Sequence, residues 1–255
     1  MTCAHAPEGK GVRHVFSVLR TKGLMHVVRS GAFIVRHRMR LYSELLYNRL
    51  FKSYRKFVYD GKRYSYLYHK YNTTWRNERA VEIPIALSVL EGYRGRKVLE
   101  VGNVLSHYTS ISHEVVDKYE KGEGVVNEDI VDFRTDKRYD LVISISTVEH
   151  VGWDEDPNDP SKVLGKGSKA LDAIAHMAAL LAPGGLMVVT FPIGVNPALD
   201  MAVAEMRIPH SRIRFMRRVS RSNRWVEAEL RECIGARYGT PYTAANALVL
   251  LHVSK

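Results

Sequence analysis

Residues 97–103 form the segment that most constrains the fold of this chain. They read Lys97-Val-Leu-Glu-Val-Gly-Asn103, an apolar, β-branched run that ends in an acid, a glycine and a small polar residue. This order is typical of a strand that runs into a tight turn, because glycine adopts positive φ and allows close backbone approach at little steric cost. In open α/β sheets, ligands bind outside the carboxyl ends of the strands. We therefore expect Glu100 and Gly102 to face a bound small molecule.

Strand-like and helix-like segments alternate from residue 75 to residue 255. Such alternation indicates a parallel sheet with right-handed crossovers. We predict an α/β fold with a Rossmann-like, doubly wound, mostly parallel seven-stranded sheet and an N-terminal helical extension. The expected strands are 98–101, 113–117, 125–129, 139–146, 186–191, either 213–219 or 224–228, and 247–253, and the expected helices of this part are about 75–92 and 170–181.

The basic charge of the chain is concentrated near its N-terminus. The formal net charge is +11, but residues 10–70 alone hold 15 Lys and Arg against two acids, Glu44 and Asp60. We therefore separate a basic, Tyr-rich helical extension (1–74) from the α/β domain (75–255). An enzyme whose catalytic body tracks nucleic acid would spread its basic charge more evenly, so nucleic acid is the less favoured partner. Two roles stay open for the extension: peripheral contact with a membrane, or covering the active site.

Cysteine usage and hydropathy bear on the location of the protein. Cys3 and Cys233 lie far apart without metal-ligand spacing, which predicts neither a disulfide framework nor a zinc site. The N-terminus lacks the uninterrupted apolar core of a secretory signal. The apolar stretch 31–35 is bounded by Arg29 and Arg36, well short of the ~20 residues that a spanning helix needs. We expect a cytoplasmic protein, either soluble or peripheral at the inner face of the membrane.

Five segments of residues 95–255 together carry a family resemblance. They are Glu100-Val-Gly-Asn-Val-Leu-Ser106, Asp117, Asn127-Glu-Asp-Ile130, Tyr139-Asp-Leu-Val-Ile-Ser-Ile-Ser-Thr-Val-Glu-His150 and Leu180-Leu-Ala-Pro-Gly-Gly-Leu-Met-Val-Val189. In the order and spacing of these segments the chain resembles the class I S-adenosylmethionine (SAM)-dependent methyltransferases, including members associated with polysaccharide and glycan biosynthesis. The turn after the first strand departs from the family pattern acid-x-Gly-x-Gly-x-Gly, because Val104 and Ser106 stand at the second and third glycine positions.

The resemblance implies SAM as the cofactor and assigns residues to it. It gives Asp117, at the end of the second strand, the ribose hydroxyls, for which a carboxylate offers paired acceptors. It gives Asp129 the adenine amino group, and Ile130 the face of the adenine ring. The cofactor-binding residues expected on this basis are Glu100, Gly102, Asn103, Asp117, Asp129, Ile130 and Ser146.

Glu149 and His150 follow the fourth predicted strand and are the main candidates for catalysis. Methyl transfer to a hydroxyl is helped by a base that removes the proton near neutral pH. We expect His150 to be this base, with Glu149 orienting it and Asp154 as a substitute, although the Glu149-His150 pair has an alternative, purely structural interpretation. Metal-binding branches of the family carry Glu-x-x-Glu-His here, and Ser146 replaces the first glutamate. We therefore expect no metal.

The leading hypothesis is a SAM-dependent O-methyltransferase acting on a sugar, a glycan or a related hydroxylated metabolite. The polar loop 153–169 offers side chains that suit sugar hydroxyls. An RNA methyltransferase is one alternative, and a degenerate methyltransferase-fold scaffold that binds a membrane or a partner is another. A group of arginines suits phosphate groups or a solvated face: Arg207, Arg212, Arg214, Arg217, Arg218, Arg221 and Arg224.

Overall fold

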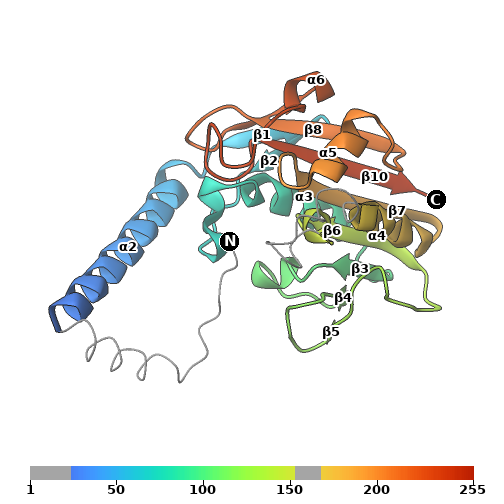
Figure 1. The fold of residues 1–255 in the computed structure, drawn as a ribbon, viewed down its shortest axis with the longest axis horizontal. Coiled ribbons are helices and arrows are strands. Elements are labelled where there is room, and N and C mark those ends of the chain that lie inside the picture. Colours follow the sequence, from blue (N-terminus) through green and yellow to red (C-terminus); the bar gives the residue numbers. More distant parts are fainter. Residues whose placement is uncertain (1–23, 153–167) are drawn as a thin grey trace. The chain divides into compact units, whose positions relative to one another are not determined.

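The computed structural model describes residues 24–152 and 168–255. Within them the chain divides into two compact units, one that ends at Leu50 and one that spans Phe51–Lys255. The described part of the first unit is a single long helix, α2 (Leu24–Phe51), and the second unit contains the sheet (Figure 1). The division therefore lies earlier in the chain than residue 74, because the Tyr-rich segment after α2 belongs to the same unit as the sheet.

Eight strands form one mixed sheet in the order β5-β4-β3-β6-β7-β10-β8-β9. The first five strands in this order pair in parallel, whereas β10, β8 and β9 add antiparallel pairs. The predicted mostly parallel α/β fold is thus confirmed. The count is eight instead of seven because the two segments offered as alternatives both form strands, β8 and β9, and pair with each other. The strands are β3 (Val98–Val101), β4 (Glu114–Val116), β5 (Val125–Val126), β6 (Tyr139–Ile145), β7 (Leu181–Pro192), β8 (Arg212–Arg218), β9 (Trp225–Ala228) and β10 (Ala247–Ser254).

Helices cover both faces of this sheet. Successive strand residues point to opposite faces, and β6 shows the consequence. Ile143 packs in an apolar cluster with α3 (Arg79–Glu91). Its neighbour Val142 packs in a second cluster that includes α4 (Ser168–Ala179) and α5 (Pro197–Ala204). The arrangement is doubly wound, as the sequence predicts, and it leaves the strand ends as the place for a ligand site.

A short hairpin from the Tyr-rich segment attaches to the far edge of the sheet. Its strands are β1 (Lys56–Tyr59) and β2 (Lys62–Ser65), which pair antiparallel across the predicted turn at residues 60 and 61. The Asp60 amide donates a 2.9 Å hydrogen bond to Glu227 Oε1, and Arg212 Nη1 lies 2.6 Å from Asp60 Oδ2. These contacts join the segment to β8 and β9, so it belongs to the sheet domain.

Asp200 in α5 leads to a prediction on the pH dependence of stability. Its Oδ2 accepts a 2.9 Å hydrogen bond from the Gly194 amide. Burial raises the pKa of Asp200 from 3.8 to about 6, although the Gly194 amide opposes this shift. The folded chain therefore binds this proton more tightly than the unfolded chain. The contribution of Asp200 to the free energy of unfolding accordingly falls as the pH rises from about 4 through about 6.

The substitution Asp200→Asn keeps an acceptor for the Gly194 amide and removes the charge. We expect it to raise the free energy of unfolding by about 1–2 kcal/mol at neutral pH, once ~1.4 kcal/mol per pKa unit is discounted for partial solvent exposure. The gain should vanish below about pH 4, where the folded wild type is neutral too. Urea unfolding at both pH values measures it, with the exposed Asp172→Asn as the matched control. A gain of equal size at both pH values would contradict the assignment.

Candidate functional site

A cavity of about 140 Å³ lies at the carboxyl ends of three neighbouring parallel strands. The turn after β3 contributes Gly102, Asn103 and Val104, the end of β4 contributes Asp117, and the exit of β6 contributes Thr147. The strands β4, β3 and β6 lie side by side in Figure 1. The cavity therefore brings together residues that the sequence separates by 45 positions. Its remaining lining residues are Tyr71, Asn72, Arg79, His107, Tyr108 and Glu120.

Glu100 holds the turn after β3 and does not face the cavity. The side chain is fully buried, and its Oε1 accepts hydrogen bonds from the amides of Val104 (2.9 Å) and Leu105 (2.7 Å). Its Oε2 lies 2.7 Å from Nε2 of His113. The expectation that Glu100 faces a ligand is thus corrected. The acid is needed because a carboxylate fixes two loop amides at once.

Gly102 is required at this turn for two separate reasons. Its φ is +87°, a conformation that side-chain-bearing residues rarely adopt. A Cβ added at this position would lie 2.2 Å from Thr147 Oγ1. By contrast, Val104 has φ of −102° and caps the short helix η2 (Leu105–His107). No glycine is needed at Val104, which explains why this departure from the family pattern leaves the turn intact.

Asp117 organises the edge of the cavity through backbone amides. Its Oδ2 accepts a 2.8 Å hydrogen bond from the Asn103 amide, and its Oδ1 accepts hydrogen bonds from the amides of Tyr119 (2.8 Å) and Glu120 (2.7 Å). One carboxylate thus ties the turn after β3 to the segment after β4. Asp117 lines the cavity, and its carboxylate fixes the positions of the two backbone segments that bound the cavity.

Asp117→Ala should weaken SAM binding by about 100-fold, because three hydrogen bonds to a charged acceptor, each contributing about 1.5–3 kcal/mol, are lost next to the cavity. Part of this energy will register as lower stability of the free protein. Calorimetric titration of SAM into the variant measures the affinity, and the exposed Glu123→Ala serves as the charge-matched control. Unchanged affinity in Asp117→Ala would remove Asp117 from the site.

Asp129 and Ile130 do not line the cavity, in contrast to the roles implied by the resemblance. Asp129 Oδ2 lies 2.7 Å from Lys169 Nζ and 3.1 Å from Lys118 Nζ. Burial opposes ionisation of this carboxyl, but the two lysines and the Val131 amide outweigh burial and lower its pKa. Ile130 is buried in the apolar core. The carboxylate is thus already neutralised by protein cations.

An aromatic wall closes another side of the cavity, and the sequence reasoning missed it. Tyr71 begins the short helix η1 (Tyr71–Arg76), which precedes α3. Its ring stacks on His107 with centroids 3.9 Å apart and meets Tyr108 edge-on at 5.6 Å. His107 Nε2 lies 2.9 Å from Glu120 Oε1. The Tyr-rich composition of residues 54–71 was the available signal, but it does not indicate which tyrosine reaches the strand ends.

Ser146 turns away from the cavity and into a buried acidic cluster. Its Oγ donates a 2.7 Å hydrogen bond to Glu82 Oε1, which also accepts a 2.6 Å hydrogen bond from Thr190 Oγ1. Arg79 Nη1 lies 3.5 Å from Glu82 Oε2 and donates to the Ile145 carbonyl at 2.9 Å. Ser146 is absent from the cavity lining, so the structure gives it a structural role in place of the predicted cofactor contact.

Glu149 and His150 lie in the short helix η3 (Val148–His150) at the exit of β6. The side chain of His150 is 51% exposed, whereas that of Glu149 is 2% exposed, and His150 Nε2 lies 3.6 Å from Glu149 Oε1. Burial raises the pKa of Glu149 well above its usual range, although Arg79 opposes this shift. The buried carboxyl of Glu149 therefore lies next to the solvent-exposed imidazole of His150. Asp154, the third catalytic candidate, lies outside the described residues.

Four of the seven arginines of the 207–224 group pair with acids. The group also includes Arg218, which is buried and donates to the carbonyls of Arg76 (2.9 Å) and Thr243 (2.6 Å). These contacts favour a surface held by ion pairs over a phosphate site. The pairs are Arg207 with Glu205, Arg212 and Arg214 with Asp60, and Arg217 with Glu232.

No protein-family model and no curated protein matches this chain. Solved structures to which it is similar include several methyltransferases. The N-methyltransferase NodS from Bradyrhizobium japonicum, in complex with S-adenosyl-L-homocysteine, is 15% identical with a TM-score of 0.42, and the match covers 70% of this chain and 88% of that chain. A SAM-dependent methyltransferase from Archaeoglobus fulgidus is 14% identical with a TM-score of 0.43, with 72% and 98% covered.

The sugar N-methyltransferase KedS8 from Streptoalloteichus sp. ATCC 53650 is 12% identical, with a TM-score of 0.33 and with 68% of this chain and 87% of that chain covered. At such identities and TM-scores the likeness concerns the fold. The reaction and the acceptor have to be inferred from the site of this chain.

Proposed function

We propose that this protein is a SAM-dependent methyltransferase that methylates a hydroxyl group of a sugar, a glycan or a related hydroxylated metabolite. The observation that carries this proposal is the cavity at the carboxyl ends of β3, β4 and β6. From β3 the sheet continues to β4 on one side and to β6 on the other. Doubly wound sheets bind their ligands at such a switch of direction.

The lining of the cavity fits the chemical groups of SAM. Asp117 and Glu120 offer carboxylate acceptors for ribose hydroxyls, and Tyr71 offers an aromatic ring for adenine. Within residues 24–152 and 168–255, the buried Asn103 Oδ1 and the Tyr108 hydroxyl have no hydrogen-bond partner. These two atoms suit the polar amino-acid end of SAM. When bound, SAM supplies a methyl group on a positively charged sulfur.

His150 is the base of the proposed reaction. It follows β6, the strand whose exit lines the cavity through Thr147, and its exposed ring is accessible to an acceptor. The exposed imidazole of His150 takes the hydroxyl proton of the acceptor, and the Glu149 carboxyl, 3.6 Å from Nε2, orients the ring. Glu149 is then a positioning residue, and Asp154 stays the predicted substitute for the base.

N-methylation of an amine is the second candidate, favoured by the buried acidic cluster. Three buried glutamates, Glu78, Glu82 and Glu149, act electrostatically on Arg79, whose side chain is 12% exposed, and Glu78 also acts on the buried Arg218. Among the described residues, Oε2 of Glu82 and Oε2 of Glu149 accept no hydrogen bond. Such a group of buried carboxyls suits an amine acceptor, because carboxyls bind its ammonium form and can take the proton that it must lose before its nitrogen accepts the methyl group.

Transfer of a labelled methyl group from SAM to a set of acceptors tests the proposal. The set contains neutral oligosaccharides and nucleotide sugars, the matching amino sugars, and structured RNA. We expect label in the hydroxyl acceptors, at oxygen by mass fragmentation. Label confined to amino sugars would replace O-methylation by N-methylation. Label confined to RNA would overturn both, and SAM binding without turnover of any acceptor would favour the scaffold alternative.

A further inference from the structure

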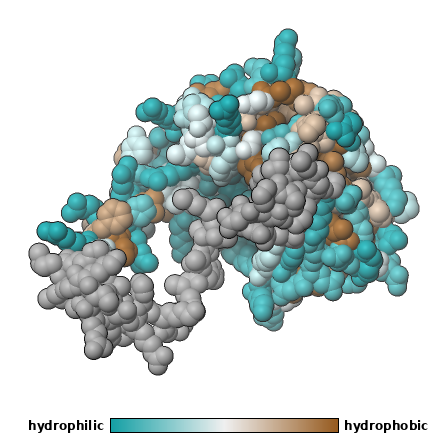
Figure 2. Space-filling view, in the orientation of Figure 1, coloured by the Kyte–Doolittle hydropathy of each residue, from teal (hydrophilic) through white to brown (hydrophobic). Residues whose placement is uncertain are grey.

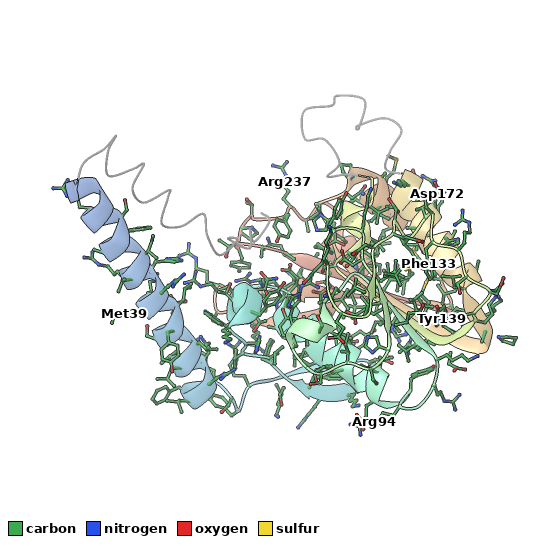
Figure 3. The ribbon with its side chains drawn as sticks, turned by 90° about the horizontal axis from the view of Figure 1, so that it is seen from below. Met39, Arg94, Phe133, Tyr139, Asp172 and Arg237 are labelled. Carbon is green, nitrogen blue, oxygen red and sulfur yellow. The ribbon has the colours of Figure 1, made fainter. Side chains whose placement is uncertain are left out.

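Helix α2 carries an exposed apolar stripe along its length. Val35, Met39, Tyr42, Leu46 and Leu50 follow one another at intervals of three or four residues, which places them on one side of a helix. All five side chains are exposed, and Met39 and Tyr42 reach 67% and 69%. Met39 projects away from the helix axis in Figure 3. Large apolar side chains at such exposure mark a surface that binds something.

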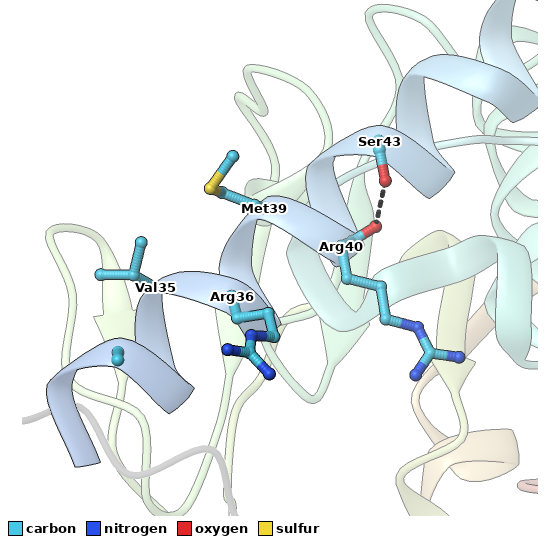
Figure 4. A pocket seen from close by; sticks show the side chains of 6 residues that line it. Val35, Arg36, Met39, Arg40 and Ser43 are labelled. Carbon is cyan, nitrogen blue, oxygen red and sulfur yellow. Dashed lines mark hydrogen bonds between the residues drawn. The ribbon is translucent and has the colours of Figure 1, made fainter. Parts of the chain in front are cut away.

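Arginines flank this stripe on both sides. Arg36 and Arg40 each come one position after a stripe residue, and Arg38 comes one position before Met39. A hollow of about 540 Å³ lies on the side of the helix that carries Arg36 and Arg40. It is lined by Ala32, Val35, Arg36, Met39, Arg40 and Ser43. Figure 4 shows Val35 and Met39 pointing to one side of the helix, with the guanidinium groups of Arg36 and Arg40 on the other side.

The charge of α2 is strongly unbalanced. The helix contains five arginines and one acid, Glu44, whose Oε1 lies 3.2 Å from Arg40 Nε. In the space-filling view, both hydrophilic and hydrophobic residues lie on the visible part of the helix (Figure 2). No helix of the described ranges, 24–152 and 168–255, has the length and apolar character to cross a bilayer. A basic helix with exposed apolar side chains suits the interface of an anionic membrane.

We propose that α2 docks on an anionic lipid surface, with the stripe in the acyl region and the flanking arginines at the lipid phosphates. This proposal does not depend on the proposed methyl transfer. The exposed stripe needs an apolar environment, and the arginines need anions, and an anionic bilayer offers both at one surface.

Two other occupants fit the observations less well. In a coiled coil between two copies of α2, Arg36 and Arg38 would flank the same seam in both helices, where like charges repel. Duplex nucleic acid offers phosphates to the arginines but leaves Met39, Tyr42 and Leu46 in water. The experiment below gives a different result for each of these two occupants.

Vesicle flotation of the full chain tests the proposal at low salt. Vesicles of phosphatidylcholine mixed with phosphatidylglycerol should bind the protein, and vesicles of phosphatidylcholine alone should bind it far more weakly. The stripe variant Met39→Asp/Leu46→Asp should lose binding. The variant with Arg36, Arg38 and Arg40 changed to Gln should bind about 100-fold more weakly, as expected for three basic residues near an anionic surface.

The control variant changes the exposed Arg94, Arg96 and Arg138 of the second unit to Gln, which alters the net charge equally, and it should bind like the wild type. Circular dichroism checks that every variant is folded. Absence of binding to anionic vesicles, or binding that survives both α2 variants, would overturn the proposal. Loss of a dimer in the stripe variant, without vesicle binding, would point to a second copy. Binding of duplex RNA but not of vesicles would point to nucleic acid.

Discussion

Replacing Gly102 with valine is expected to abolish SAM binding, with a loss of about 100-fold or more. A β-branched side chain resists the φ of +87° found at this position, and its Cβ would overlap Thr147, whose Oγ1 would lie at 2.2 Å. Backbone strain and overpacking each cost about 1–3 kcal/mol, and about 1.4 kcal/mol is a tenfold change in affinity. Gly102 and Thr147 both line the cavity. Any shift that relieves the overlap between the valine side chain and Thr147 therefore changes the shape of the cavity.

The matched control for this variant is Gly95→Val. Gly95 has a φ of +74°, so it shares the backbone strain, but an added Cβ meets no atom within 4 Å. Calorimetric titration should show near-normal SAM affinity in Gly95→Val and none in Gly102→Val. The milder Gly102→Ala, in which the overlap remains without β-branching, should lie between them. Normal affinity in Gly102→Val would mean that the cofactor lies elsewhere.

Replacing His150 with alanine is expected to lower the rate of methyl transfer by about 10²–10⁴, the usual contribution of a general base. The affinity for SAM should stay the same, because His150 does not line the cavity. Single-turnover kinetics with the acceptor identified in the transfer assay measures the rate, and titration of SAM measures the affinity.

Two further measurements separate a chemical role of His150 from a structural one. Added imidazole should restore part of the rate in His150→Ala, since it supplies the missing base in solution. Glu149→Gln should alter the pH dependence of the rate while leaving SAM affinity unchanged, because it removes the carboxyl 3.6 Å from the imidazole. A near-normal rate in His150→Ala would show that alignment of the acceptor suffices or that another group is the base.

The sheet could be predicted from the sequence because its strands are short apolar runs bounded by turn residues. The nearly continuous apolar run 139–146 contains β6 (Tyr139–Ile145), which is buried over most of its length, and Gly102 lies where the backbone requires positive φ. Such features depend on neighbouring residues along the chain. They are therefore visible without knowledge of the tertiary structure.

The role of each acid in the site could not be predicted, because it depends on partners that are distant in the sequence. The Glu100 carboxylate interacts with two loop amides and with His113. The Asp129 carboxylate forms ion pairs with Lys118 and Lys169. Spacing alone does not distinguish these acids from Asp117, which lines the cavity. The placement of Tyr71 in the cavity wall likewise follows from the packing of η1 against η2, which no local pattern reports.

Titration of SAM into the wild-type protein, followed by calorimetry, tests the central claim most directly. The cavity at the ends of β3, β4 and β6 is predicted to bind one SAM per chain, and the reaction product S-adenosyl-L-homocysteine should compete for the same site. NAD, the ligand of other doubly wound sheets, should neither bind tightly nor compete. Absence of SAM binding, or a preference for NAD over SAM, would contradict the assignment of this cavity.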